Sequence, residues 1–242
     1  MPTLYQKYRP HKFSDITGQE HIVQTITNEI KNDQIAHAYL FYGARGIGKT
    51  TIARLLAKAT NCQNKKDGEL EPCNECNSCK EINKGNSIDI IEIDAASHTG
   101  VDNVRENIIE NAQFKPTKSK YKVFIIDEVH MLSTSAFNAL LKTLEEPPSH
   151  AIFILATTEL HKLPATVVSR CQRFHFKKIP YDQMLTKLKK ITETESIKVD
   201  KKVLEKVVNK SDGCLRDAES LLGQILSLDL KTIKLEDAEI IL

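Results

Sequence analysis

Residues 43–50 have the sequence Gly-Ala-Arg-Gly-Ile-Gly-Lys-Thr, which matches the phosphate-binding loop pattern Gly-x4-Gly-Lys-Ser/Thr. The pattern is informative where a buried strand precedes it and a helix follows it. Both are indicated here, by the apolar run Ala38–Tyr42 and by a helical pattern over Thr51–Ala59. A glycine-rich turn without a ligand is the alternative, but chance produces the full pattern in roughly one of a hundred such chains. The motif therefore requires a strand–loop–helix unit.

Further apolar runs of strand type alternate with helical patterns along the first part of the chain. They are Ile88–Ile93, Val123–Ile126, Ile152–Thr157 and Gln172–Phe176. Near-continuous apolar strands of this length are typical of parallel sheets that helices cover on both faces. We therefore expect an α/β fold with a doubly wound parallel sheet.

Two of the covering helices have signals at their ends. Residues 17–20, Thr-Gly-Gln-Glu, predict a capping box that opens a helix with its apolar stripe around Ile22 and Ile26. Ser133 is expected to be the N-cap of a second helix, which the prolines at 147 and 148 terminate.

The pattern changes after Pro180. From Tyr181 onward strand-type runs are absent, and three or four amphipathic helical patterns follow. We expect an α/β domain over residues 1–179 and a small all-helical lid domain over residues 180–242. The apolar ending Ile240–Leu242 has no helix stop, which favours a boundary inside a longer protein.

The residue types of the loop account for phosphate and Mg²⁺ binding. Glycines let backbone N–H groups point toward the phosphates, and the following helix adds the positive end of its dipole. Lys49 is expected to reach the β and γ phosphates, and Thr50 to bind Mg²⁺. The expected nucleotide contacts of this segment are Gly43, Ala44, Arg45, Gly46, Ile47, Gly48, Lys49, Thr50 and Thr51.

Asp127 and Glu128 follow the third apolar run. Ligands bind at the carboxyl ends of strands in open parallel sheets, so Asp127 is expected to hold Mg²⁺ directly or through water. Glu128 can polarise a water molecule toward the γ-phosphate, which favours hydrolysis over transfer to an acceptor. In isolation an acidic pair after a strand is about as often a solvated turn. Its combination with the phosphate loop favours the catalytic interpretation.

Four of the six cysteines lie close together in the sequence. They are Cys62, Cys73, Cys76 and Cys79. The last three follow the Cys-x2-Cys spacing of structural zinc sites, and four thiolates complete a tetrahedral coordination. We expect Zn²⁺ to stabilise about residues 60–85 without a part in catalysis. Buried free thiols, an iron–sulfur cluster and a nucleic-acid-binding zinc knuckle are alternatives. Cys171 and Cys214 are expected to be core residues.

Composition excludes some classes of protein and leaves others open. A formal net charge of +2 does not by itself indicate a nucleic-acid partner. The apolar runs are far shorter than the roughly 20 residues that span a bilayer, and residues 1–9 lack the apolar stretch of a secretory signal. We therefore expect a cytoplasmic protein without a membrane partner, whose thiols stay reduced.

Several segments together resemble the clamp-loader branch of AAA+ ATPases. They are Lys7–Pro10 with Phe13, Asp15 and Gly18–Gln19, the phosphate loop, Asp127–His130, Ser169–Cys171 and Gly213–Asp217. The cysteine insertion and the segment Ala139–Pro148 narrow the resemblance to the bacterial gamma/tau subunits of DNA polymerase III. The resemblance covers essentially the whole chain.

This resemblance implies a subunit of a ring that contains delta, delta-prime and other gamma/tau copies. The ring uses ATP to open a sliding clamp and to close it around primed DNA. The implied cofactors are ATP, Mg²⁺ and Zn²⁺, and the DNA polymerase chemistry, a nucleotidyl transferase activity, resides in another subunit. The family's third, collar domain is missing from these residues, so poor ring assembly is expected of them.

The resemblance also assigns roles to single residues. The adenine pocket is implied to include Tyr8, Arg9 and Pro10, with simple packing of the N-terminal arm as the alternative. Thr158 has the position of the first sensor and Arg216 that of the second. Arg170 has the position of an arginine finger that is supplied to the ATP of a neighbouring subunit. Without the family, both arginines are more often surface residues.

Three other functions compete with this interpretation. A P-loop phosphotransferase needs an acceptor pocket, which Glu128 and the helical segment do not favour. A non-catalytic, zinc-bearing nucleic-acid module does not need an intact phosphate loop. An AAA+ helicase or branch-migration motor shares the loop and the sensors, and the Ser169–Cys171 triplet and the cysteine insertion favour the clamp loader over it.

Overall fold

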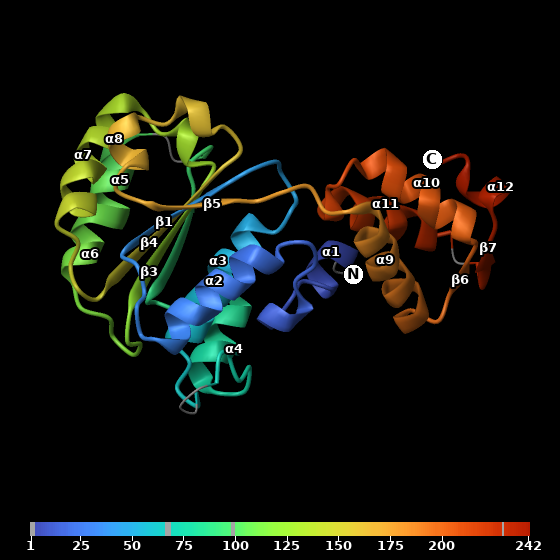
Figure 1. The fold of residues 1–242 in the computed structure, drawn as a ribbon, viewed down its shortest axis with the longest axis horizontal. Coiled ribbons are helices and arrows are strands. Elements are labelled where there is room, and N and C mark those ends of the chain that lie inside the picture. The colour runs from blue at the N-terminus through green and yellow to red at the C-terminus, as the bar shows by residue number, and fades with distance from the viewer. Residues whose placement is uncertain (1–2, 66–68, 98–99, 229) are drawn as a thin grey trace.

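Five strands form one parallel sheet in the computed structural model, which describes residues 3–65, 69–97, 100–228 and 230–242 (Figure 1). The strands are β1 (Ala38–Tyr42), β2 (Ile90–Asp94), β3 (Lys122–Asp127), β4 (Ala151–Thr157) and β5 (Gln172–His175). Their order is β2-β3-β4-β1-β5, and each adjacent pair is parallel. The predicted α/β class and parallel sheet are confirmed.

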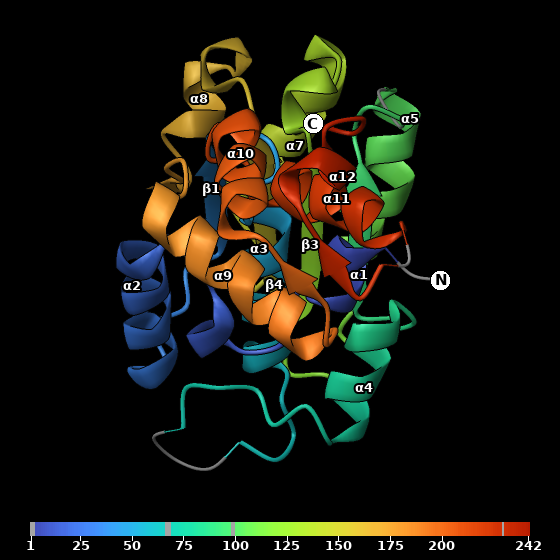
Figure 2. The same ribbon diagram turned by 90° about the vertical axis from the view of Figure 1, so that its right-hand side faces the viewer.

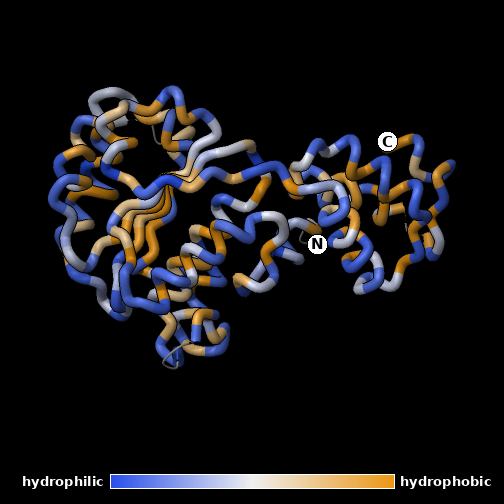
Figure 3. Tube along the Cα trace, viewed as in Figure 1, coloured by the Kyte–Doolittle hydropathy of each residue, from blue (hydrophilic) through white to orange (hydrophobic). Residues whose placement is uncertain are grey.

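Successive strand residues alternate between two hydrophobic clusters, one on each face of the sheet. In β1, Phe41 belongs to the first cluster and Leu40 to the second. In β3, Ile125 belongs to the first cluster and Phe124 to the second. Strands that are buried on both faces must be apolar throughout, which explains the near-continuous apolar runs (Figure 3).

Helices cover both faces of this sheet (Figures 1 and 2). Helices α2 (Glu20–Lys31) and α3 (Lys49–Thr60) contribute to the first cluster. The second cluster is completed by α5 (Val101–Val104), the π-helical η2 (Arg105–Glu110), α6 (Asn111–Gln113), α7 (Thr134–Glu145) and α8 (Ala165–Val168). Short 3₁₀ turns are η1 (Phe13–Asp15), η3 (Val129–Met131) and η4 (Leu160–Lys162).

The predicted start of α7 is confirmed, whereas that of α2 was wrong. Ser133 is the N-cap of α7, and its Oγ accepts a hydrogen bond from the backbone N–H of Ala136 at 3.2 Å. Helix α2 begins at Glu20, with Gln19 as its N-cap and no side-chain cap. The buried Gln19 side chain instead bonds to the backbone of Ile47 and of Lys177, so the polar segment serves tertiary contacts.

Within the described part of the chain, four helices follow the sheet, and their apolar side chains make up most of a third hydrophobic cluster. The helices are α9 (Tyr181–Thr194), α10 (Lys201–Ser211), α11 (Leu215–Leu226) and α12 (Leu235–Ala238). The expectation that strands end before Tyr181 was wrong, because β6 (Lys198–Val199) and β7 (Thr232–Ile233) pair in parallel. Strands of two residues are too short for a periodic pattern. The division into two domains near residue 180 stays a prediction.

An N-terminal arm, residues 3–19, lies between the sheet and the helical segment (Figure 1). Its helix α1 (Leu4–Lys7) packs against α11. The Tyr8 hydroxyl donates to Glu195 Oε1 at 2.6 Å, while Phe13 is buried in the first cluster of the sheet. The arm therefore contacts both parts of the chain. No helix among the described residues has the length and apolarity needed to cross a membrane.

Candidate functional site

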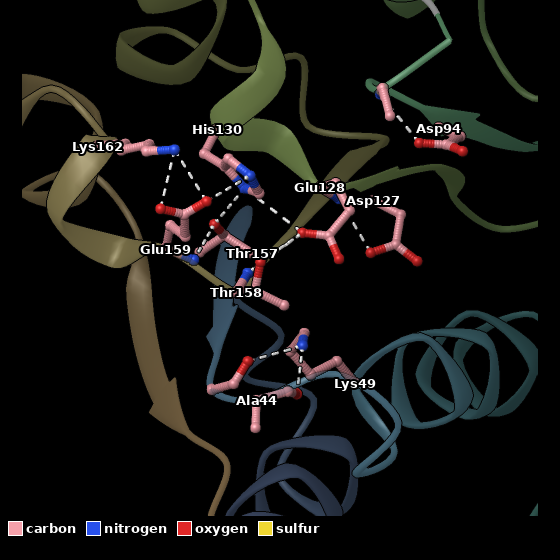
Figure 4. A network of polar contacts seen from close by, with 12 residues as sticks. Ala44, Lys49, Asp94, Asp127, Glu128, His130, Thr157, Thr158, Glu159 and Lys162 are labelled. Carbon is pink, nitrogen blue, oxygen red and sulfur yellow. Dashed lines mark hydrogen bonds and ion pairs between the residues drawn. The ribbon is translucent and has the colours of Figure 1, made fainter. Parts of the chain in front are cut away.

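The phosphate loop connects the end of β1 to the start of α3, as its sequence predicts. Gly48, which precedes α3, has a φ of 107°, in the left-handed region that favours glycine. Lys49 is buried, and its Nζ donates to the carbonyl oxygens of Gly43 at 2.8 Å and Ala44 at 2.7 Å (Figure 4). Burial lowers the pKa of Lys49, although the carboxylates that follow β3 oppose this shift.

The two predicted Mg²⁺ ligands contact each other directly. Thr50 Oγ1 donates to Asp127 Oδ2 at 2.7 Å, which joins the start of α3 to the end of β3. The other carboxylate oxygen of Asp127 accepts the backbone N–H of Glu128 at 2.9 Å. The hydroxyl and the carboxylate are oxygen ligands of the kind that Mg²⁺ prefers, so this pair fits the ion.

Glu128 lies beside these groups in an unusual backbone conformation. Its φ of 47° is in the left-handed region, which non-glycine residues rarely adopt. Such conformations cost of order 1–3 kcal/mol and concentrate at functional sites. Glu128 Oε2 accepts hydrogen bonds from the hydroxyl of Thr158 at 3.0 Å and from its N–H at 3.3 Å (Figure 4). The predicted catalytic carboxylate and first sensor are therefore direct partners.

A histidine extends this polar network away from the loop (Figure 4). His130 Nδ1 lies 2.9 Å from Thr157 Oγ1 and 3.4 Å from Glu128 Oε2. Its Nε2 lies 3.4 Å from Glu159 Oε1, and Glu159 also accepts from Lys162 Nζ at 2.9 Å. This network leaves no pattern in the sequence, because its members come from two segments that only the sheet brings together.

A cavity extends from the phosphate loop to the arm and the helical segment. One wall consists of Arg45, Gly46, Ile47, Gly48, Lys49, Thr50, Thr51, Asp127 and Glu128. The rest of the lining consists of Tyr5, Arg9, Pro10, Ile16, Thr17, Ile179, Lys187, Leu215, Arg216 and Glu219. The cavity therefore combines the predicted phosphate site with groups from three separate parts of the chain.

The structure places the predicted arm residues differently. Arg9 and Pro10 line the cavity, but Tyr8 does not. The ring of Tyr8 packs against the third hydrophobic cluster, which agrees with the alternative that it packs the arm. Tyr5, one helical turn earlier, lines the cavity in its place. Its ring centroid lies 4.8 Å from the guanidinium carbon of Arg216, within range of a cation–π contact.

Arg170 lies away from this cavity. It follows α8, and its guanidinium donates to the carbonyl oxygen of Thr166 at 2.6 Å and pairs with Glu145. It is absent from the lining of the cavity, as is Thr158, which reaches the site through Glu128. The position of Arg170 agrees with the expectation that it does not contact nucleotide at the phosphate loop of its own chain.

The helical segment touches the phosphate loop at Gly46 and, through an ion pair of Arg45 with Asp217 at 3.2 Å, at the residue before it. The backbone N–H of Arg216 donates to the carbonyl oxygen of Gly46 at 3.2 Å. A Cβ at Gly46 would lie 2.3 Å from Cys214 Sγ, so this contact leaves no room for a side chain. Cys214 is buried, as predicted, and so is Cys171. The helical segment thus packs on the loop backbone itself.

Glu219 is a cavity residue that the sequence analysis missed. It is buried, with 6% of its surface exposed, and burial raises its pKa to about 7, while Lys187 acts in the opposite sense. The sequence does contain a sign of its burial, because Glu219 interrupts the apolar stripe of α11 between Ala218 and Leu222. A carboxylate on a buried stripe is rare unless it has a partner or a ligand.

The four clustered cysteines converge. Their sulfur atoms all lie within 4.8 Å of one another, and the Cys73 and Cys79 sulfurs are 3.9 Å apart. Zn–S bonds of about 2.3 Å in a tetrahedron separate the sulfurs by about 3.8 Å. Cys76 is the N-cap of α4 (Asn77–Lys84), where its Sγ accepts from the Cys79 N–H at 3.4 Å. This donor set fits Zn²⁺; residues 66–68 of the expected connecting loop lie outside the described residues.

Polar contacts tie the cysteine segment to the rest of the chain. The carboxylate of Glu71 accepts the backbone N–H groups of Phe13 at 2.7 Å and Ser14 at 2.8 Å, in the N-terminal arm. The buried Lys58 of α3 donates to Asn74 Oδ1 at 2.6 Å and Asn83 Oδ1 at 2.9 Å. The segment is therefore bonded to both the arm and the helix that follows the phosphate loop.

The fold and the site define a P-loop protein of the α/β class. A family model described as DNA polymerase III, delta subunit, matches residues 18–180, and the chain belongs to this family. The DNA polymerase III subunit tau of Bacillus subtilis is 52% identical over 98% of this chain and 42% of the relative. That of Escherichia coli is 47% identical over 93% of this chain and 34% of the relative.

These comparisons confirm the predicted resemblance to gamma/tau subunits. The DNA polymerase III subunit gamma of Buchnera aphidicola is 50% identical over 93% of this chain and 62% of the relative. The chain thus spans between 34% and 62% of the length of these three relatives. Among solved structures, the RuvB Holliday junction branch migration motor of Thermotoga maritima has a TM-score of 0.69. The alignment covers 97% of this chain and 72% of the RuvB chain at 14% identity, so the two proteins share a fold.

Replacing Glu219 should change how stability depends on pH. Because burial raises the folded-state pKa from 4.5 to about 7, the wild type loses stability as the pH rises through this interval. The neutral Glu219→Gln variant lacks this loss. Its stability relative to the wild type should increase between pH 4.5 and 7, by up to about 3 kcal/mol, and then level off.

Urea denaturation of both proteins from pH 4.5 to 8.5, followed by circular dichroism, measures this difference. The exposed Glu236→Gln variant is the matched control and should show no such trend. A stability difference that stays constant over the whole range would contradict a raised pKa at Glu219.

Proposed function

We propose that the chain is the ATP-binding and ATP-hydrolysing part of a bacterial clamp-loader subunit. One observation carries the proposal: Lys49, the Thr50–Asp127 pair and Glu128 converge on a single cavity at the carboxyl ends of β1 and β3. An ammonium group, a site for Mg²⁺ and a carboxylate are the groups that phosphoryl transfer to water needs. The matched DNA polymerase III family supplies the assignment to replication.

In this proposal the loop holds the triphosphate. The N–H groups of the loop and of the first turn of α3 bind phosphate oxygens, and Lys49 exchanges its carbonyl partners for the β and γ phosphates. Thr50 and, directly or through water, Asp127 would hold Mg²⁺. The ion neutralises charge that develops on the phosphates.

Glu128 is proposed to orient the attacking water. Its carboxylate accepts two hydrogen bonds from Thr158, the proposed first sensor, and lies 3.4 Å from the His130 ring. These partners fix the direction of the carboxylate after β3. A bound γ-phosphate would attract the Thr158 hydroxyl away from the Glu128 carboxylate. The carboxylate oxygen that this frees could then accept a hydrogen bond from the attacking water, so Thr158 and Glu128 would both respond to the γ-phosphate.

The remaining wall of the cavity is proposed to hold the nucleoside. Arg9 and Pro10 come from the arm, and Arg216 acts as the second sensor that links nucleotide to a helical lid domain over residues 180–242. The contact between Arg216 and Gly46 supports this link, because phosphates bound by the loop act on the same backbone. Arg170 is proposed to serve the ATP of a neighbouring subunit.

The cysteine cluster is proposed to be a structural zinc module. Cys62, Cys73, Cys76 and Cys79 would hold the ion and leave no open position for a reacting group. The bonds from Glu71 to the arm and from Lys58 to the cysteine segment support a role in holding the fold.

The proposed partners are those that the resemblance to gamma/tau subunits implies, and the names of the relatives as DNA polymerase III subunits support a replication complex. They are delta and delta-prime subunits, other gamma/tau copies, the sliding clamp and primed DNA, in the cytoplasm. A branch-migration motor is the second candidate, since RuvB has the same fold. Identities of 47–52% to polymerase subunits favour the clamp loader over it. Stimulation of ATP hydrolysis by clamp and primed DNA, rather than by four-way junctions, tests the choice in the full-length assembly.

Two substitutions should separate nucleotide binding from hydrolysis. Lys49→Ala is expected to weaken ATP binding at least about tenfold, because a charge-assisted phosphate contact is lost. Glu128→Gln should keep the ATP affinity but slow hydrolysis about 10²–10⁴-fold. Calorimetric titration and phosphate release measure the two quantities, with exposed Lys189→Ala as the control. Equal ATP affinity of Lys49→Ala and the wild type would overturn the proposed site.

The purified protein should contain one zinc ion per chain. Its removal by a chelator should destabilise residues 60–85, because the binding energy of a structural Zn²⁺ is also folding energy. Elemental analysis and hydrogen exchange with and without chelator measure both effects. Iron in place of zinc, or no metal at all, would refute the proposed module.

Arg170→Ala should affect ATP hydrolysis little in the isolated chain and strongly in the assembled protein. In the isolated chain it should change ATP hydrolysis little, because Arg170 does not line the cavity of its own chain. In the full-length protein assembled with its partners, it should leave ATP binding near normal and reduce clamp-stimulated hydrolysis by about 10³–10⁵-fold. A comparable loss in the isolated monomer would mean that Arg170 acts within its own subunit.

A further inference from the structure

Glu219 is a buried acid that faces the cavity without a protein partner. Only 6% of its surface is exposed, and it lines the cavity from α11. Among the described residues no hydrogen bond reaches its carboxylate, and no cationic group lies within 4.0 Å of it. A buried carboxyl group without a partner is costly, and burial raises its pKa to about 7 accordingly. An acid kept at such a cost next to a ligand cavity points to a partner in the ligand.

The cations nearest to this part of the cavity do not neutralise Glu219. Lys187 on α9 acts on it only from beyond ion-pair distance, and Arg216 on α11 lies against the ring of Tyr5. Arg9 of the arm lines the same cavity and likewise forms no ion pair with Glu219. The carboxylate is therefore not the fixed counter-charge of any one of these groups.

The position of Glu219 indicates which part of a nucleotide it meets. The phosphates belong at the loop, with Lys49 and Thr50, where they would repel a second carboxylate. Glu219 lies about one helical turn beyond Arg216, the residue of α11 that bonds to the loop, and the cavity lining also includes the apolar side chains of Ile16, Ile179 and Leu215. A bound N–H or O–H donor favours the ionised form of Glu219, and an ionised carboxylate only accepts hydrogen bonds. In a nucleoside triphosphate, the donors are the ribose hydroxyls and the amino or N–H groups of the base.

We propose that Glu219 is a specificity-determining residue that accepts a hydrogen bond from the nucleoside part of the bound nucleotide. The proposal rests on the proposed nucleotide-binding function. The donor is either the exocyclic amino group of the base or a ribose hydroxyl; both present an N–H or O–H group to the same acceptor. In either case Glu219 discriminates against nucleotides that lack the donor, since an unfilled buried acceptor is penalised on binding.

A purely structural role for Glu219 has a different signature. If the carboxylate only balanced Lys187 and Arg216, its loss would weaken every ligand of the cavity alike. If it recognises the nucleoside, its loss weakens only ligands that carry the donor. Inorganic tripolyphosphate, which has phosphates but no nucleoside, separates the two roles.

The experiment compares the complete wild-type chain with Glu219→Leu, Glu219→Gln and the exposed control Glu236→Gln. Calorimetric titrations give Kd values for ATP, 2′-deoxy-ATP, 3′-deoxy-ATP, purine riboside triphosphate and tripolyphosphate. Purine riboside triphosphate lacks the amino group of adenine, so it tests the base, and the two deoxy analogues test the ribose. Thermal denaturation checks that each variant is folded.

In Glu219→Leu we expect ATP affinity to fall roughly 10- to 100-fold while tripolyphosphate affinity is unchanged. The wild type should bind one of the three analogues more weakly than ATP by a similar factor, and Glu219→Leu should lose that preference. Glu219→Gln keeps the side-chain volume and one accepting oxygen, so it should retain part of the preference for ATP over that analogue. It provides the same test if the leucine variant does not fold.

Two failures are distinguishable. Unchanged preferences of both Glu219 variants among ATP and its analogues, or an equal loss of tripolyphosphate affinity, would overturn the role of Glu219 alone. A wild type that binds none of the nucleotides would overturn the proposed function, and this inference with it.

Discussion

The parallel hydrogen bonding of β1, β3 and β4 is the constraint on which the site depends. The register pairs Tyr42 with Thr157 and Ile126 with Leu155, so all three strands end at the same edge of the sheet. The phosphate loop, the Asp127–Glu128 pair and Thr158 each follow one of these ends. None of these groups is close to the others in sequence. A shift of one strand by a single residue would exchange its two faces and break every contact at this edge.

The sequence predicted the parts of this arrangement that rest on local patterns. Near-continuous apolar runs identified the central strands β1, β3 and β4, since strands buried on both faces have little freedom of composition. The strand-type patterns at Ile88–Ile93 and Gln172–Phe176 also predicted the edge strands β2 and β5, which are more exposed. The loop motif and Asp127 were found because their chemistry fixes residue types at fixed spacing. Ser133 was found as a cap because its hydroxyl bonds within three residues.

Features that depend on distant partners escaped the sequence. Thr17–Glu20 has the letters of a capping box, yet Gln19 is recruited by the backbone of Lys177 and the helix begins later. The pairing of β6 with β7 involves two residues in each strand and leaves no periodicity. Tyr5 lines the cavity instead of Tyr8 because α1 packs on α11, which composition cannot reveal. In each case a tertiary contact overrode a local preference.

The contact between Gly46 and α11 has a mechanical consequence. Two backbones meet there through one hydrogen bond from the N–H of Arg216, and even a methyl group on Gly46 would collide with Cys214. Beside this bond, the Arg45 guanidinium pairs with Asp217 at 3.2 Å, so the loop and α11 are joined at two neighbouring residues. A displacement of the loop backbone at Gly46 would therefore act directly on the first turn of α11. Because α9 and α10 pack against α11, they would follow such a displacement.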